Sequence, residues 1–213
     1  ADWVRLTPLH YRFTLRADRQ PFHDGTPLSA FDVQATYRSV LDPATGSAHR
    51  GSLNMIERVE AVTKDVVDFY LKTTDLLFAG RLVIGIMPAR LINADHPFSE
   101  TPVCSGLFRF ESWPQPEHLR IERIADGARV EFQRVQKPDV RVLKLLRGEL
   151  DVLQGDMPPE LLAWVANRQQ GKAGEQSGAM DTVQLIKQAG TTFAYLGFNL
   201  QDPVVGDLRV RQA

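Results

Sequence analysis

The sequence has a single cysteine, Cys104, among its 213 residues. One cysteine excludes a disulfide within the chain and any metal site built from several thiolates. Long hydrophobic runs are also lacking. The longest candidate, residues 82–87, is far shorter than the roughly 18 residues that a membrane-spanning helix needs. We therefore predict that the chain contains no membrane span.

The chain also lacks an excess of charge of either sign. It has 25 Lys and Arg against 26 Asp and Glu, with a formal net charge of −1, and both signs are mixed along its length. Nucleic acids and anionic membrane surfaces attract strongly basic surfaces. The charge balance therefore argues against either of them as the main partner.

Motifs of catalysis and cofactor binding are equally scarce. No two of the five histidines form a His-x-His or His-x-x-x-His pair, so local spacing offers no metal site. Gly171-Lys172 resembles the end of a phosphate-binding loop, but Ala166 and Ala173 stand where such a loop requires glycine and a hydroxyl residue. We predict no catalytic residues, no metal and no cofactor.

What is present is a regular succession of strand and helix signals in the first part of the chain. Residues 11–16 alternate as a strand does, and Asp24-Gly25 is typical of a tight turn. Ser29 and Asp32 have the spacing of a capping box that opens a helix. Beyond that helix the pattern predicts two strands over 56–62 and 66–72, followed by a short helix over 75–83.

The later part of the chain alternates strands and helices. Its predicted strands span residues 107–113, 119–124, 129–135, 150–153, 183–187 and 192–200. Its predicted helices span residues 138–146 and 158–165 and begin again after Asp207. The fold class is therefore mixed α/β, with a boundary near Asp126-Gly127. A helix that breaks off after about two turns has little stability of its own, and we interpret the chain as a piece of a longer polypeptide.

Seven short blocks carry a resemblance to a known family. The blocks are residues 11–16 (YRFTLR), 22–25 (FHDG), 28–33 (LSAFDV), 102–110 (PVCSGLFRF), 146–151 (LRGELD), 195–200 (YLGFNL) and 207–213 (DLRVRQA). In this order they resemble the family 5 extracellular solute-binding proteins, the oligopeptide, dipeptide and nickel receptors of ABC importers. One departure is Cys104, which replaces the first glycine of the family's Gly-Thr-Gly-Pro-Phe turn, so Cys104 is expected to adopt a backbone conformation that glycine tolerates better.

The resemblance implies a periplasmic-binding-protein-like fold of the large three-lobed type, truncated here at both ends. It implies that residues 1–125 form the small second lobe with part of the entering strand. Residues 126–213 would be the returning portion of the first lobe, ending at the start of a helix of the third. The implied location is periplasmic or otherwise outside the cytoplasmic membrane.

The resemblance also implies a function. The parent protein would capture a small solute, most simply a short peptide, and deliver it to an ABC transporter permease by hinge closure and without catalysis. Residues at strand ends that face the cleft of such a receptor are the predicted ligand contacts: Gln154, Gly155, Asp156, Tyr195, Phe198 and Asn199.

Two other classes of function remain open at this stage. A cytoplasmic transcription regulator can carry the same receptor domain as its ligand sensor. A hydrolase that uses Cys104 as nucleophile would need a histidine near it in space and a lowered thiol pKa. No residue next to Cys104 in the sequence provides such an activation.

Overall fold

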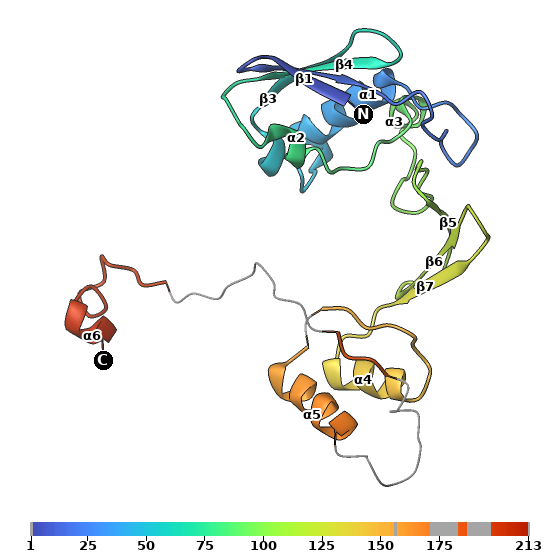
Figure 1. Ribbon diagram of the computed structural model, residues 1–213. Coiled ribbons are helices and arrows are strands. Elements are labelled where there is room, and N and C mark those ends of the chain that lie inside the picture. The colour runs from blue at the N-terminus through green and yellow to red at the C-terminus, as the bar shows by residue number, and fades with distance from the viewer. Residues whose placement is uncertain (1, 156, 171–182, 187–196, 213) are drawn as a thin grey trace. The chain divides into compact units, whose positions relative to one another are not determined.

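The computed structural model describes residues 2–155, 157–170, 183–186 and 197–212. The chain divides into two compact units, residues 1–134 and 135–213 (Figure 1). The strands are β1 (Asp2–Thr7), β2 (His10–Thr14), β3 (Ile56–Ala61), β4 (Val66–Leu71), β5 (Phe108–Gln115), β6 (His118–Arg123) and β7 (Arg129–Gln133). The α-helices are α1 (Ala30–Leu41), α2 (Phe78–Arg81), α3 (Ala89–Asn93), α4 (Pro138–Leu146), α5 (Pro159–Gln170) and α6 (Leu208–Gln212), and two short 3-10 helices are η1 (Pro43–Thr45) and η2 (Gly51–Leu53).

The first unit begins with a four-stranded antiparallel sheet in the order β1-β2-β4-β3. Two hairpins, β1-β2 and β3-β4, are joined through the pairing of β2 with β4, in which Phe13 lies opposite Val67. The strands predicted over 11–16, 56–62 and 66–72 are thus confirmed. The predicted helix over 75–83 is shorter than expected and is confined to α2. The Asp75 side chain accepts the Leu77 N–H and forms a local turn there instead of a helical one.

One face of this sheet and helix α1 enclose the hydrophobic core (Figure 1). Strand residues of period two supply Tyr11, Phe13 and Phe69 from the sheet, and α1 supplies Val33 and Tyr37 at helical spacing. Phe69 lies at the centre, with its ring edge-on to those of Phe13 and Tyr37 at centroid distances of 5.4 and 5.0 Å. Aromatic packing therefore joins both hairpins to α1.

The opposite face of the same sheet is polar and holds a buried carboxylate. Asp68 is 1% exposed. Arg12, directly opposite on β2, donates from Nε and Nη2 to its two oxygens at 2.8 and 2.7 Å. His10 Nε2 lies 3.0 Å from Asp68 Oδ2, and its ring stacks on Tyr70 at 4.3 Å. The hydrogen bonds from Arg12 are the main cause of a lowered pKa of Asp68, and the nearby His10 ring acts in the same direction.

Asp32 in the first turn of α1 holds two helix starts together. Its Oδ2 accepts the backbone N–H and the hydroxyl of Ser29 at 2.8 Å, as the capping-box spacing predicts. Its Oδ1 accepts the N–H of Ala89, the first residue of α3, also at 2.8 Å. Helix N-termini leave backbone N–H groups without intrahelical partners, so this one carboxylate serves both α1 and α3.

We expect Asp32→Ala to lower the free energy of unfolding by about 2 kcal/mol, because a partly buried cap with three accepted hydrogen bonds is lost. Asp42→Ala is the matched control: Asp42 is exposed and accepts one N–H, from Ala44. Its loss should cost under about 1 kcal/mol. Urea denaturation monitored by circular dichroism measures both. Equal effects of the two substitutions would contradict the double role of Asp32.

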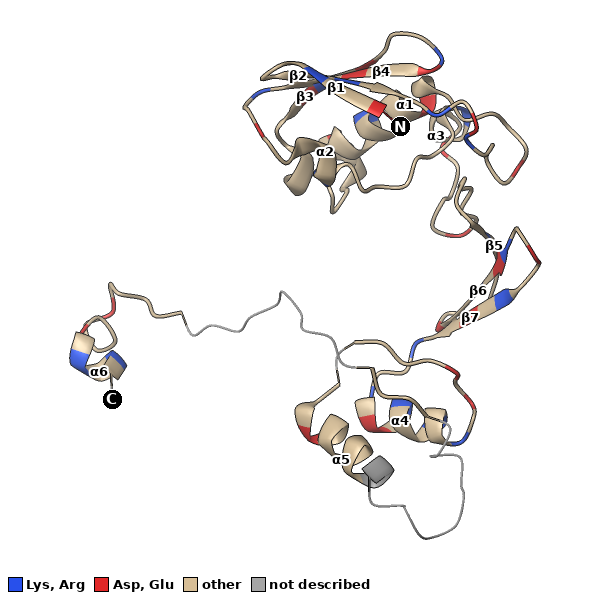
Figure 2. Ribbon diagram, in the orientation of Figure 1, with Lys and Arg blue, Asp and Glu red and all other residues tan. Residues whose placement is uncertain are grey.

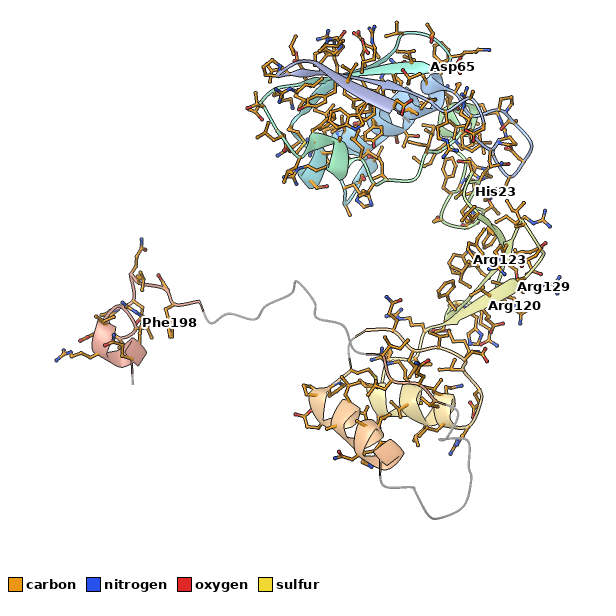
Figure 3. The ribbon with its side chains drawn as sticks, in the orientation of Figure 1. His23, Asp65, Arg120, Arg123, Arg129 and Phe198 are labelled. Atoms are coloured by element: carbon orange, nitrogen blue, oxygen red, sulfur yellow. The ribbon has the colours of Figure 1, made fainter. Side chains whose placement is uncertain are left out.

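The first unit also contains a three-stranded antiparallel sheet, β5-β6-β7, as predicted from residues 107–135. Its cross-strand pairs place opposite charges beside each other. Arg120 lies 2.7 Å from Glu131, which also pairs with His118 at 2.7 Å, and Arg109 lies 3.1 Å from Glu122. Basic and acidic residues are correspondingly mixed on these strands (Figure 2), and Arg120, Arg123 and Arg129 can be followed in Figure 3.

The second unit contains α4 and α5, which the spacing of apolar residues predicts, and α6. The N-cap expected at Asp207 is confirmed, since its Oδ1 accepts the Arg209 N–H at 2.9 Å. The predicted strand over 150–153 is wrong: this segment has no regular structure. Residues 183–186 and 197–200, the described parts of the other two predicted strands, are not strands either. A strand needs a paired neighbour, and the described part of this unit supplies none.

Candidate functional site

Two of the predicted ligand contacts lie in the connection between α4 and α5. Gln154 and Gly155 are both exposed there. Gly155 has φ 75°, a left-handed conformation that favours glycine, and so allows the chain to turn toward Pro158 and α5. Asp156 lies outside the described residues. The loop therefore presents Gln154 to solvent immediately before the second helix.

Two further predicted contacts precede α6. Phe198, labelled in Figure 3, and Asn199 are exposed. The side-chain oxygen of Asn199 accepts the N–H of Gln201 at 3.1 Å and so stabilises the following turn. Tyr195 lies outside the described residues. The four described members of the predicted set thus lie on two segments of the second unit, and no side-chain partner is described for Gln154 or Phe198.

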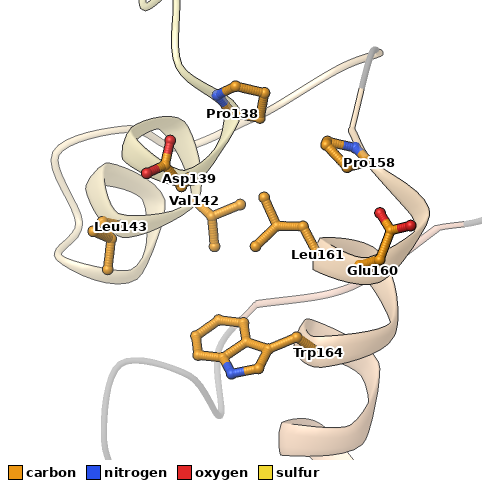
Figure 4. Close-up of a pocket in the computed structure, with 8 residues that line it drawn as sticks. All are labelled: Pro138, Asp139, Val142, Leu143, Pro158, Glu160, Leu161 and Trp164. Atoms are coloured by element: carbon orange, nitrogen blue, oxygen red, sulfur yellow. The ribbon is translucent and has the colours of Figure 1, made fainter.

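An apolar pocket of about 570 Å³ lies between α4 and α5. Val142 and Leu161 point toward each other across it, and Trp164 closes it one turn further along α5 (Figure 4). Both helices begin beside a proline, which is favoured in a first helical turn. Because Pro158 lines the pocket, the loop that carries Gln154 and Gly155 leads directly to its edge.

Two exposed carboxylates belong to the rim of this pocket. Asp139 lies in the first turn of α4 and Glu160 in the first turn of α5. A carboxylate in a first helical turn is favoured by the helix dipole. The pocket thus combines an apolar floor with negative charge at its edge, which suits an apolar group that stands beside a cationic one.

Sequence reasoning missed this pocket. An aromatic residue on an apolar helix face is most often buried in a core, yet Trp164 is 39% exposed. The signal that could have identified the pocket is the placement of two helices, each opened by a proline, on either side of the predicted contact loop.

In the first unit, two of the sequence blocks meet at His23. Its backbone N–H donates to the Cys104 carbonyl at 2.8 Å, and its Nε2 donates to the Gly106 carbonyl at 2.9 Å. Cys104 does not have the backbone conformation that its glycine-like position led us to expect. Among the described non-glycine residues only Asp95 has a positive φ. The two hydrogen bonds of His23 fix the turn before β5 to the Asp24-Gly25 turn.

The surroundings of Cys104 do not activate its thiol. Partial burial raises the pKa of Cys104, whereas a nucleophilic cysteine needs a lowered one. Within the described ranges, no three His, Cys, Asp or Glu side chains gather as a metal site would require. No helix among the described residues is long and apolar enough to cross a membrane.

Comparison with solved structures defines the fold. The Campylobacter jejuni protein NikZ, solved in complex with Ni(L-His), superimposes with a TM-score of 0.70 at 22% identity, over 99% of this chain and 42% of that one. The oligopeptide-binding protein AppA of Bacillus subtilis, solved with a nonapeptide, gives a TM-score of 0.61 at 22% identity, over 70% of this chain and 33% of that one. The fold is that of part of a large solute-binding protein, and the predicted fold class is confirmed.

Sequence comparison identifies the family. The profile described as "Bacterial extracellular solute-binding proteins, family 5 Middle" matches residues 2–213, and the chain belongs to this family. Protein XP55 of Streptomyces lividans is 33% identical over 162 residues, covering 71% of this chain and 29% of its own length. AppA is 23% identical over 211 residues, covering 90% of this chain and 36% of its own. The chain thus spans about a third of the relatives it matches.

Membership in this family bears on the hydrolase, one of the two alternatives that the sequence left open. The family consists of bacterial extracellular solute-binding proteins, which are not enzymes, so the prediction of a non-enzymatic binding protein is confirmed. The raised pKa of Cys104 agrees with this outcome. The Cys104-dependent hydrolase is accordingly set aside.

Proposed function

We propose that the protein containing this chain is the solute-binding component of an ABC importer that captures a short peptide outside the cytoplasmic membrane and delivers it to a membrane permease. The observation that carries the proposal is the similarity to the oligopeptide-binding protein AppA over 90% of this chain. NikZ was solved with nickel and histidine, so related folds take chemically different solutes. Peptide is the ligand that we favour for this chain.

The α4–α5 region supports a peptide in preference to a bare metal ion. Its pocket has an apolar floor and carboxylates at the rim, which matches an apolar side chain next to a peptide's positive amino group. Within the described residues no group of metal ligands is assembled. We therefore propose that Gln154, Gly155, Asp156, Tyr195, Phe198 and Asn199 approach the bound peptide.

The division of the chain into two units supports a two-part organisation. We propose that residues 1–125 belong to a small second lobe and that residues 126–213 return to the first. The chain divides after Arg134 by internal contacts, because β7 pairs with β6 and so stays with the first unit. Closure of lobes around the solute would then proceed by a hinge, as in other receptors that enclose their ligands.

The test is a ligand screen on the full-length gene product. A ligand that binds only the native state raises the melting temperature as its concentration exceeds its Kd. We expect pools of peptides of two to nine residues to raise it, and Ni(L-His) and oligosaccharides to leave it unchanged. Stabilisation by Ni(L-His) alone would overturn the peptide assignment, and no stabilisation by any pool would overturn the proposed function.

Single substitutions then test the proposed contacts. With the peptide found in the screen, we expect Gln154→Ala to weaken binding about three- to tenfold, the range for one lost hydrogen bond. Val152→Ala, a change at an exposed residue of the same loop, should leave the Kd unchanged. Isothermal titration calorimetry measures both, and equal Kd values for the two variants would remove Gln154 from the site.

A further inference from the structure

The two faces of the three-stranded sheet β5-β6-β7 differ in their chemistry. On one face, Phe110 of β5 lies opposite Ile121 of β6, and Ile121 lies opposite Val130 of β7. The next pair along β6 and β7 on this face is Leu119 with Phe132. Because successive side chains of a strand point to opposite faces, apolar residues of all three strands gather on one side of the sheet.

Trp113 extends this side of the sheet beyond an irregularity in β5. The register of β5 with β6 shifts between Phe110 and Ser112. The ring of Trp113 lies 5.7 Å from that of Phe110, which places both rings on the same side. The apolar sheet face therefore consists of Phe110, Trp113, Leu119, Ile121, Val130 and Phe132.

The other face of the sheet is charged, and its charges are paired within the sheet. Its cross-strand ion pairs are Arg109 with Glu122 at 3.1 Å, Arg120 with Glu131 at 2.7 Å and Arg129 with Glu111 at 3.3 Å. Arg120 and Arg129 are labelled in Figure 3. An antiparallel sheet commonly leaves one such polar face in water while the other packs on a core. The apolar sheet face is thus the side that requires a cover.

The described chain leaves the apolar sheet face uncovered. No residue of β5, β6 or β7 is buried, and Trp113 and Phe132 are 45% and 55% exposed. The four-stranded sheet of the same unit differs, because α1 packs on its apolar face and Phe69 there is 1% exposed. A contiguous exposed apolar patch marks an interaction surface.

The size of the apolar sheet face favours a partner within the same polypeptide. Strands lie about 4.8 Å apart and rise about 3.4 Å per residue, so three strands of about five residues present a face of about 250 Å². A stable interface between separate proteins buries about 800 Å² on each partner. A smaller contact suffices within one polypeptide, because the covalent connection removes much of the entropy cost of association.

The relatives extend well beyond the part that this chain matches, since the chain spans 36% of AppA and 42% of NikZ. Within residues 135–213, Val142 and Leu161 face each other across the α4–α5 pocket. We propose that in the full-length protein a segment outside residues 1–213 packs apolar side chains on the apolar sheet face. The proposal does not depend on which solute is bound, and its failure would leave the proposed peptide-binding function untouched.

Oxidation by hydroxyl radicals, followed by mass spectrometry, tests whether the face is covered. In the native full-length gene product we expect Trp113 and Phe132 to be protected as completely as the buried Phe69. In the 213-residue chain alone, both should be oxidised much faster while Phe69 stays protected, because only the covering segment is missing. Rapid oxidation of Trp113 and Phe132 in the full-length protein would overturn the proposal.

A photo-crosslinker then identifies what covers the face. With p-benzoylphenylalanine in place of Phe132 in the full-length protein, irradiation should give a crosslink within one polypeptide to a residue outside 1–213. The same group in place of Arg129, which is 73% exposed on the charged face, should give none. A crosslinked dimer would assign the face to a second copy, and a crosslink into residues 135–213 would assign it to the second unit. Either result, or no crosslink from position 132, would overturn the proposal.

Discussion

Replacement of Phe69 by alanine is expected to lower the free energy of unfolding of the first unit by about 4 kcal/mol. Large-to-small changes of a buried phenylalanine cost about 3–5 kcal/mol, through lost transfer energy and the cavity left behind. Phe69 is 1% exposed and touches Phe13, Tyr37 and Phe78 at centroid distances of 5.0 to 5.6 Å. Its removal would separate the sheet from both α1 and α2.

Urea denaturation followed by Trp3 fluorescence measures this effect, and two further variants serve as controls. Phe69→Leu keeps most of the volume and is expected to cost under about 2 kcal/mol. Phe132→Ala removes the same side chain from β7, where it is 55% exposed, and should cost under about 1 kcal/mol. A loss in Phe69→Ala no larger than that in Phe132→Ala would show that the core does not depend on this ring.

Replacement of Asp68 by asparagine is expected to lower the free energy of unfolding by about 3 kcal/mol at pH 7. The change removes the charge that Arg12 and His10 share in a buried position. Removal of one partner from such an ion-pair network lowers the free energy of unfolding by about 3–5 kcal/mol when all groups are fully buried. Arg12 is partly exposed and can be rehydrated, so the lower end of that range applies.

We also expect the effect of Asp68→Asn on the free energy of unfolding to depend on pH. The pKa of Asp68 is lowered in the folded state. Its ionised form therefore stabilises the fold above the unfolded-state pKa of about 3.9 and ceases to do so as the pH falls through the folded value. The difference in free energy of unfolding between wild type and Asp68→Asn should have its largest value at pH 6–7 and become smaller as the pH falls below about 4.

Glu60→Gln is the matched control for this pair of measurements. Glu60 lies opposite Asp68 in the β3–β4 register but is exposed, and among the described residues it forms an ion pair only with Arg58. Its loss should cost under about 1 kcal/mol. A difference between wild type and Asp68→Asn that stays constant down to pH 3 would contradict the role assigned to the Asp68 charge.

Local patterns predicted most of the first unit. Alternation over residues 11–16 and 66–72, and the spacing of Ser29 and Asp32, depend on neighbours within a few residues. Such signals survive in any tertiary context that buries the apolar face. The strand predicted over 150–153 failed because an apolar run shows only that a segment can be buried, and strand formation needs a pairing partner.

The candidate sites could be predicted only in part. The contact loop at Gln154 and Gly155 followed from a family resemblance, and its exposure agrees with a role in binding. The pocket beside it depends on the approach of Val142 on α4 to Leu161 on α5. The periodicity of apolar residues in one helix does not show where the apolar face of another helix lies. The sequence pattern therefore predicted two amphipathic helices but not the pocket between them.

The sequence by itself determined what this chain cannot be and to which family it belongs. The single cysteine excluded a disulfide-stabilised scaffold, and the balanced charge argued against a protein that binds polyanions. The ordered sequence blocks identified a solute-binding protein. Only the tertiary structure decided that Asp68 is buried under Arg12 and that the Phe69 ring packs against those of Phe13 and Tyr37. Both depend on β2 pairing with β4, whose residues lie more than fifty positions apart in the chain. Such register is set by the packing of the whole sheet against α1.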